Sequence, residues 1–193
     1  MKKDEISLQT RRLLAVSLKK FMAKKPFDKI TVSEILEDCE IARPTFYYHF
    51  QDIYALLEWT FDTEAIELLK KSKDYMTWDE GLLLMLQYIK DNEKVCLCAY
   101  NSLGWRVLER MISKDTIPLM RQFVEQLAVN TSAKPDHIAF ITEFYATALV
   151  GCYAKWLSGG MKQTPEEMID LIYIAMYGGI EVALERSAKS KKE

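Results

Sequence analysis

The sequence predicts an all-α fold, with a small N-terminal helical domain followed by a larger one. Only seven glycines and five prolines occur among 193 residues, and 49% of the residues are apolar. Apolar residues recur at helical spacing, and several threonines are followed three residues later by glutamate, the pattern of a capping box at a helix start. No segment alternates as a strand does. The chain therefore has the composition of a globular helical protein.

The first predicted helix covers residues 7–24, and Pro26 disfavours its continuation. Its apolar positions are Leu8, Leu13, Leu14, Val16, Leu18, Phe21 and Met22. Thr31 and Glu34 form a capping box that starts a short second helix, which ends before Pro44.

Pro44 suits the first turn of a third helix, so a helix-turn-helix is predicted. Phe46 and Phe50 are four residues apart and share the face that packs against the domain. The opposite, outward side carries Thr45, Tyr48 and His49, with Tyr47 at its border.

Further helices are predicted along the rest of the chain. Asp52 caps a fourth helix through residue 71, and Thr77 with Glu80 opens a helix through about residue 90. The next three predicted helices cover residues 93–102, 105–113 and 117–130. Asp136 caps a helix that runs to Leu157 and is stopped by two glycines.

The last predicted helix starts at a capping box formed by Thr164 and Glu167, with Pro165 at its first position. It is expected to run to about Arg186, and residues 187–193 are expected to form a frayed tail.

The charge is distributed unequally along the chain. Residues 1–50 have a balance of +3 and residues 51–193 a balance of −5, although the net charge is only −2. A basic excess of this size is compatible with a phosphate-binding N-terminal part, or simply with a solvated helix face.

The start of the chain lacks the apolar stretch of a signal peptide, and no run is long enough for a membrane span, so we expect a cytoplasmic protein. Its cysteines, Cys39, Cys96, Cys98 and Cys152, are then expected to be reduced. Cys96 and Cys98 are two residues apart, which on a helix turns their thiols about 200° away from each other. This favours structural cysteines over a metal or redox site, and no metal or cofactor is expected.

An enzyme is the competing class of protein, and the sequence contains few features that support this class. His49 and His137 are the two histidines, and neither a zinc-binding histidine pattern nor a glycine-rich phosphate loop occurs. Glu166 and Glu167 are better explained as helix N-terminal charges than as a catalytic pair. A helical adaptor that binds only protein is a third class, which the outward polar groups of the third helix and Arg43 disfavour.

The segment Ile30–Leu57 reads ITVSEILEDCEIARPTFYYHFQDIYALL and resembles the helix-turn-helix signature of the TetR family of bacterial transcription regulators. The resemblance implies a DNA-binding domain in residues 1–52 and an effector-binding and dimerisation domain in residues 53–193. It further implies a homodimer that binds a palindromic operator, responds to a ligand and acts more often as a repressor.

Carried over residue by residue, the resemblance divides the DNA-binding residues into three groups. It implies phosphate contacts for Thr45, Tyr47 and His49. It implies contacts with base edges or thymine methyls for Arg43, Pro44 and Tyr48, and a cap near the DNA backbone for Thr31. The chemistry fits, because hydroxyl and imidazole groups suit phosphate oxygens, whereas arginine reads guanine and apolar surfaces contact thymine methyls.

Three positions depart from the family's pattern. Glu40 replaces the usual glycine of the turn, Ala42 replaces the serine that caps the recognition helix, and Ile53 replaces a lysine at the start of the fourth helix. These changes predict strain, a lost cap and a lost phosphate contact. They indicate modest DNA affinity or, alternatively, a DNA-binding domain that has lost its function.

The segment Val150–Met168, VGCYAKWLSGGMKQTPEEM, also resembles the C-terminal domain of regulators in the dihydroxyacetone kinase activator group. That likeness would imply activation through a protein partner in place of repression relieved by a small molecule. Both modes remain open at this point.

Several aromatic and methionine side chains are candidates for an effector cavity between helices, with burial in an ordinary core as the alternative. They are Trp59, Trp78, Met85, Tyr88, Trp105, Phe140, Phe144 and Tyr145. The two last long helices are the candidates for a dimer interface, because they are apolar on several faces and contain Gly151, Gly178 and Gly179, which allow close approach. Burial of these helices within one chain is the alternative.

Overall fold

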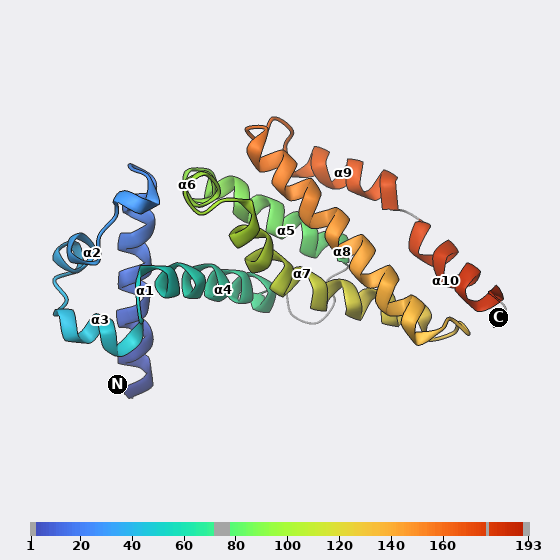
Figure 1. Ribbon diagram of the computed structural model, residues 1–193, viewed down its shortest axis with the longest axis horizontal. Helices are drawn as coiled ribbons and strands as arrows, with labels where there is room; N and C mark the ends of the chain where they lie inside the picture. Colours follow the sequence, from blue (N-terminus) through green and yellow to red (C-terminus); the bar gives the residue numbers. More distant parts are fainter. Residues whose placement is uncertain (1–2, 72–77, 177, 191–193) are drawn as a thin grey trace. The chain divides into compact units, whose positions relative to one another are not determined.

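The computed structural model describes residues 3–71, 78–176 and 178–190, and within these ranges it contains helices and no strand (Figure 1). Contacts divide the chain into two compact units. The first contains Met1–Tyr75 and Asn92–Gly104, and the second contains Met76–Asp91 and Trp105–Glu193. No helix in the described part of the chain is both long enough and apolar enough to span a membrane. The all-α prediction is confirmed.

The first unit is built around its N-terminal helix. Its elements are α1 (Lys3–Met22), the short 3-10 helix η1 (Phe27–Lys29), α2 (Val32–Cys39), α3 (Arg43–His49), α4 (Ile53–Lys71) and α6 (Glu93–Leu103). Helix α1 packs against α2, α4 and α6, while α2 packs against α3 and α6 packs against η1. The core includes Leu14, Leu18, Phe27, Ile35, Phe46, Leu56 and Leu57. Burial of these apolar side chains is the main term that holds the helices together.

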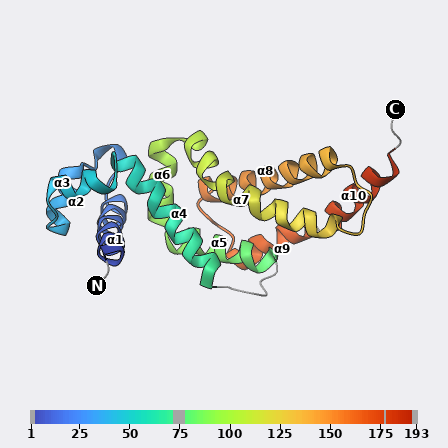
Figure 2. The same cartoon turned by 90° about the horizontal axis from the view of Figure 1, so that it is seen from below.

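The second unit contains α5 (Trp78–Asp91), α7 (Trp105–Ala128), α8 (Pro135–Ser158), α9 (Pro165–Met176) and α10 (Gly179–Lys189). Helices α7 and α8 run alongside each other, as Figure 2 shows, and α5 packs against α9. Helix α10 contacts α7, α8 and α9. The interior of this unit includes Leu86, Val124, Leu149, Tyr153, Trp156, Ile172 and Leu184.

The helix starts expected from local sequence are largely confirmed. The capping boxes of Thr31 with Glu34 and of Thr164 with Glu167 are both formed. The Asp52 carboxylate accepts a hydrogen bond from the Ala55 N–H at 2.8 Å and so caps α4. The box expected at Thr77 lies outside the described residues.

Several helix boundaries differ from the prediction, and the first concerns Pro118. Residues expected to form two helices, 105–113 and 117–130, form the single helix α7 with Pro118 inside it. A proline in a helix interior costs about 3 kcal/mol. The packing of α7 along α8, which buries Met120 and Val124, compensates for that cost.

The second difference is at the start of α8, where Asp136 does not act as the cap. The helix begins at Pro135, and the preceding Lys134 makes no side-chain capping bond. Because the fixed φ angle of proline suits the first helical position, the helix starts two residues earlier than it would with Asp136 as its cap. Asp136 instead lies in the first turn, where its charge suits the helix dipole.

The third difference is that the predicted last helix is two helices. Gly178 has a φ angle of 71°, a left-handed conformation, and is the N-cap of α10. A Cβ atom on Gly179 would lie only 2.5 Å from the Tyr145 hydroxyl, so the close approach at this glycine occurs within one chain. Local sequence did not show that two adjacent glycines would interrupt an otherwise helical pattern.

The expected frayed tail is wrong for its first residues. Helix α10 continues to Lys189, and Ser187 is buried. The Ser187 hydroxyl accepts a hydrogen bond from the Lys134 N–H at 3.0 Å and lies 2.9 Å from Nδ1 of His137. This tertiary contact with the start of α8 explains why the helix does not end near Arg186.

Candidate nucleic-acid interface

Helix α3 is anchored by two phenylalanines, as its sequence predicts. Phe46 is fully buried and Phe50 is 5% exposed, and their ring centroids are 5.9 Å apart. The Phe50 ring also meets that of Trp59 in α4, with centroids 5.7 Å apart. These contacts fix the rotation of α3 about its axis, and so determine which side chains point to solvent.

The opposite side of α3 presents polar and aromatic groups to solvent. Tyr47 is 50% exposed and Tyr48 is 73% exposed. Arg43 and Pro44 are also exposed. Thr45 and His49, the other two predicted DNA contacts on this helix, are half-buried. The predicted anchoring face is confirmed, and Tyr48 points outward as predicted, whereas Thr45 and His49 are less exposed than the outward face was expected to be.

Arg43 and Tyr47 form one connected group on this face. The Arg43 guanidinium carbon lies 5.8 Å from the centroid of the Tyr47 ring, and its Nη2 donates to the Tyr47 hydroxyl at 3.5 Å. An arginine stacked on an aromatic ring loses less conformational freedom when it binds a ligand, because its side chain is already ordered. The pair is therefore suited to contacts with guanine edges or phosphates.

His49 lies at the C-terminal end of α3, close to a cationic side chain. Burial, and then the positive charge of Arg11, lower its pKa below the usual value. Arg11 is itself held over the Trp59 ring, with its guanidinium carbon 5.4 Å from the ring centroid. An anion placed beside His49 and Arg11 would counteract the lowering and favour the protonated imidazole.

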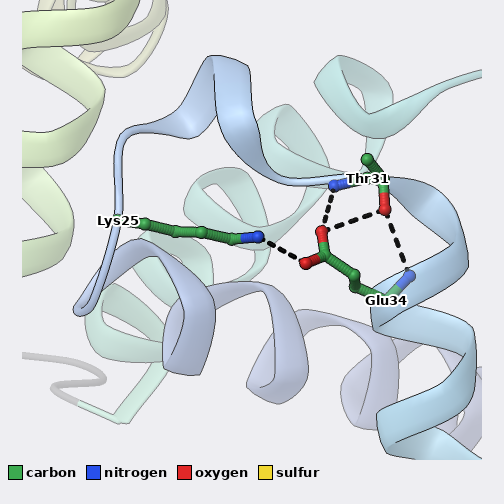
Figure 3. A network of polar contacts seen from close by, with 3 residues as sticks. All are labelled: Lys25, Thr31 and Glu34. Atoms are coloured by element: carbon green, nitrogen blue, oxygen red, sulfur yellow. Dashed lines mark hydrogen bonds and ion pairs between the residues drawn. The ribbon is translucent and has the colours of Figure 1, made fainter.

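Thr31 is held at the N-terminus of α2 by a network of polar contacts (Figure 3). Its hydroxyl accepts from the Glu34 N–H at 3.3 Å, while its hydroxyl and its backbone N–H each donate to Oε2 of Glu34 at 2.9 Å. The other Glu34 oxygen accepts from Nζ of Lys25 at 2.6 Å. The hydrogen bond from Lys25, together with those from Thr31, lowers the pKa of Glu34 to about 2. The cap is therefore formed by a carboxylate that remains ionised at neutral pH.

Two of the three departures from the family's pattern, Glu40 and Ala42, have the local structures expected for them. Glu40 adopts a left-handed conformation with φ 54° and ψ 36°, and Ala42 is an N-cap without a side-chain hydrogen bond. Ile53 is half-buried at the start of α4. The turn and the recognition helix thus form without the glycine and the serine that usually favour them.

The candidate effector residues do not form one group. Trp59 belongs to the first unit, where it contacts Phe50. Met85 and Tyr88 are half-buried on α5 in the second unit. The side chains of Trp78 and Trp105 lie outside what the structure describes.

Phe140 and Phe144 are a correction to the effector-cavity hypothesis. They are 68% and 59% exposed on α8, with ring centroids 6.4 Å apart, so they do not line a cavity inside one chain. Because α8 buries another face against α7 and α10, its apolar sequence on several sides leaves this pair on the surface.

Sequence reasoning missed the residues that support the interface from a distance. Ser17 donates to the Asp38 carboxylate at 2.8 Å, and Lys20 also binds that carboxylate. Ser102 of α6 accepts from the Phe27 N–H at 3.0 Å. No signal in a single sequence marks such pairs, because their members are far apart along the chain.

Two family models match the chain. Residues 17–59 match the model described as bacterial regulatory proteins of the tetR family, and residues 76–178 match the model described as transcriptional regulator C-terminal region. The first match contains the complete helix-turn-helix described above, and the second covers most of the second unit.

A curated relative is the HTH-type dhaKLM operon transcriptional activator DhaS of Lactococcus lactis subsp. lactis (strain IL1403), 37% identical over 87 residues. The match covers 45% of this chain and 46% of the relative, so the chain spans less than half the length of the curated relative it matches.

Two solved structures resemble the fold over most of its length. A dihydroxyacetone kinase operon activator DhaS has a TM-score of 0.74 at 23% identity, covering 90% of this chain and 97% of that one. A TetR transcriptional regulator from Streptococcus agalactiae 2603V has a TM-score of 0.61 at 20% identity, covering 90% and 96%. At these identities the likeness shows the fold alone. From the two family models, the helix-turn-helix and the shared fold, the chain belongs to the TetR family of bacterial transcriptional regulators, which bind DNA and are not enzymes.

Proposed function

We propose that the protein binds a palindromic DNA operator as a homodimer, with its two α3 helices in successive major grooves about 34 to 36 Å apart. The observation that carries this proposal is the outward face of α3, where Arg43, Tyr47 and Tyr48 are exposed on a helix whose opposite side is anchored by buried rings. DNA is the target, so the protein acts in the bacterial cytoplasm.

The proposed contacts divide by chemistry. Thr45, Tyr47 and His49 bind phosphate oxygens, which orients the helix without reading sequence. The residues that read bases or thymine methyls are Arg43, Pro44 and Tyr48. Thr31 places the N-terminus of α2 against the DNA backbone, where the positive end of the helix dipole favours phosphate.

The exposed apolar side chains of the second unit support the homodimer. Phe140 and Phe144 lie one turn apart on α8, and nothing lies within 4 Å of the Cβ position of Gly151, two turns further along the helix. Ile174 of α9 and Val182 of α10 are also exposed. Pairing α8 with its symmetry mate would remove the two phenylalanines from water, and the small Gly151 permits close helix approach.

An effector bound in the second unit would alter DNA affinity if it favours one of two dimer geometries. Met85 and Tyr88 remain candidates for contacts with it. Tyr153 is a further candidate, because its hydroxyl is buried and has no hydrogen-bond partner among the residues that the structure describes. A buried hydroxyl without a partner costs about 1 to 3 kcal/mol, which a polar ligand atom or an internal water would offset.

Activation is the second candidate for the direction of regulation, beside the repression that the family resemblance favours. It is supported by the name of the relative that is 37% identical over 87 residues, a transcriptional activator. Control by a protein partner is the corresponding alternative to a small-molecule effector. It is compatible with weak autonomous DNA binding, since Glu40, Ala42 and Ile53 each remove a feature that helps the motif bind.

The test is fluorescence anisotropy of the purified protein with a labelled duplex from its own upstream region and with a scrambled duplex, each at two salt concentrations. Preferential binding that weakens with salt is expected, because cationic side chains displace counterions from DNA. The absence of binding to either duplex at low salt would reject autonomous DNA binding and favour the partner-controlled alternative. A promoter reporter with and without the gene then distinguishes activation from repression.

A further inference from the structure

Helix α6 has an unusual place in the chain. It belongs to the first unit by its contacts, but residues 76–91 before it and 105–193 after it belong to the second unit. Both ends of α6 are therefore covalently continuous with the second unit.

Helix α6 holds the linker between α1 and α2 by two polar contacts. The Ser102 hydroxyl accepts from the Phe27 N–H at 3.0 Å, and the Cys98 thiol donates to the Lys25 carbonyl at 3.4 Å. The Phe27 N–H is at the start of η1, where a helix offers it no internal partner. Ser102 therefore satisfies a partly buried donor that the linker cannot satisfy itself.

The same linker holds the cap of α2. Nζ of Lys25 donates to Glu34 at 2.6 Å, and Glu34 in turn accepts from the backbone and hydroxyl of Thr31 (Figure 3). The Phe27 side chain is buried, and its ring meets the ring of Tyr54 in the first turn of α4 with centroids 5.1 Å apart. A continuous series of contacts thus joins α6 to the N-terminus of α2.

We propose that Ser102 is a positioning residue for DNA binding, which fixes the linker so that Lys25 holds the Thr31 and Glu34 box where the DNA backbone requires it. The proposal rests on the proposed function, in which Thr31 lies against the backbone. Ser102 itself does not touch DNA.

The first test uses Ser102→Ala, with Ser102→Thr as the conservative variant that keeps a hydroxyl. Ser102→Ala is expected to weaken DNA binding about three- to tenfold, to the same extent for specific and scrambled duplexes. Ser102→Thr is expected to retain most of the wild-type affinity, because it keeps the hydroxyl. The salt dependence should not change, because no cation is removed. Thr60→Val is the matched control, since Thr60 is buried in the same unit and its hydroxyl donates to the Leu56 carbonyl within its own helix.

A double-mutant cycle shows whether Ser102 acts through the cap. In a Thr31→Val background, Ser102→Ala should cause little further loss of DNA affinity. The contact of Thr31 with the DNA backbone, which Ser102 is proposed to position, is already absent there. A full additional loss would overturn the proposal, as would Ser102→Ala binding within twofold of the wild type. Equal losses from Ser102→Ala and Thr60→Val would also overturn it, since they would indicate general destabilisation.

Amide hydrogen exchange provides a readout that needs no DNA. Ser102→Ala should speed exchange at Phe27, Thr31 and Glu34, and leave unchanged the amide of Phe50, which caps α3 by donating to the Phe46 carbonyl. Faster exchange at Phe27 alone would overturn the proposal, because the effect would end in the linker. If the wild type binds no duplex, the proposed function fails, and exchange at Thr31 and Glu34 then decides whether Ser102 positions the cap.

Discussion

The Arg43 guanidinium lies against the Tyr47 ring one turn further along α3, and it donates to the tyrosine hydroxyl at 3.5 Å. The two side chains therefore form one surface, in which the position of each depends on the other. Their proposed roles nevertheless differ, since Tyr47 is assigned to phosphate and Arg43 to a base edge. Replacing one group at a time separates the two roles.

Tyr47→Phe removes the hydroxyl and keeps the ring that supports Arg43. We expect DNA affinity to fall about tenfold for every sequence, because a hydrogen bond to a charged phosphate is lost. Anisotropy titrations with specific and scrambled duplexes measure the change. Tyr48→Phe is the matched variant, and it should have little effect because its ring, not its hydroxyl, is proposed to contact DNA. A loss limited to one base position would contradict the phosphate role of Tyr47.

His49 predicts a pH dependence of DNA binding. Burial and Arg11 hold its pKa below the ordinary value in the free protein, and a bound phosphate would raise it. Because DNA then binds the protonated form better, affinity should rise as the pH falls from 8 to 6, by up to about tenfold for a shift of one pKa unit. The His49→Gln variant should lose this dependence. An identical pH profile for both proteins would remove His49 from the phosphate contacts.

Glu40 predicts a stabilising substitution. Its φ angle of 54° costs a residue with a side chain about 1 to 2 kcal/mol, whereas glycine adopts it freely. Glu40→Gly should raise the free energy of unfolding by about 1 kcal/mol, less what glycine gains in the unfolded chain. Urea denaturation measures the difference.

Met161 offers the contrasting control for that experiment. It also has a positive φ angle, 49°, but its side chain is buried. Met161→Gly should therefore destabilise the protein by about 2 kcal/mol or more, because the loss of a buried side chain outweighs the relief of backbone strain. If both variants were stabilised equally, side-chain burial at Met161 would contribute nothing, contrary to the structure.

The sequence was sufficient where the physical cause is local. A threonine and a glutamate three residues apart cap α2, and a phenylalanine pair four residues apart anchors α3, because both depend only on helix geometry. The strain at Glu40 was predictable for the same reason, once the family's pattern had identified the turn. The sequence predicted that a segment is helical more reliably than it predicted the residues at which the helix begins and ends.

Tertiary contacts decide what local sequence cannot. Pro118 lies inside α7 because packing against α8 outweighs its cost, and α10 is extended because Ser187 binds the start of α8. Exposure of Phe140 and Phe144 likewise depends on which face of α8 meets its neighbours. A helix that is apolar on several sides does not show which side stays open.

Glu34 predicts a change of stability in acid. Its pKa is about 2 in the folded protein, against 4.5 for a free carboxyl group, because Lys25 and Thr31 stabilise the carboxylate. Its contribution is therefore complete above about pH 4.5 and is lost as the pH falls toward 2. Denaturation midpoints measured across this range should decline less steeply for Glu34→Gln than for the wild type. Parallel declines would show that Glu34 contributes nothing to the acid sensitivity.

Phe144 tests the proposed dimer. An arginine at this exposed position would place an unpaired charge in the interface between two α8 helices, so Phe144→Arg should shift the protein toward monomers in sedimentation experiments. Val16→Arg is the control, because Val16 is an equally exposed apolar residue on α1 in the other unit. DNA affinity should fall with Phe144→Arg even though α3 is intact, since a monomer reaches only one half-site. A dimer that persists in the variant would place the interface on another face.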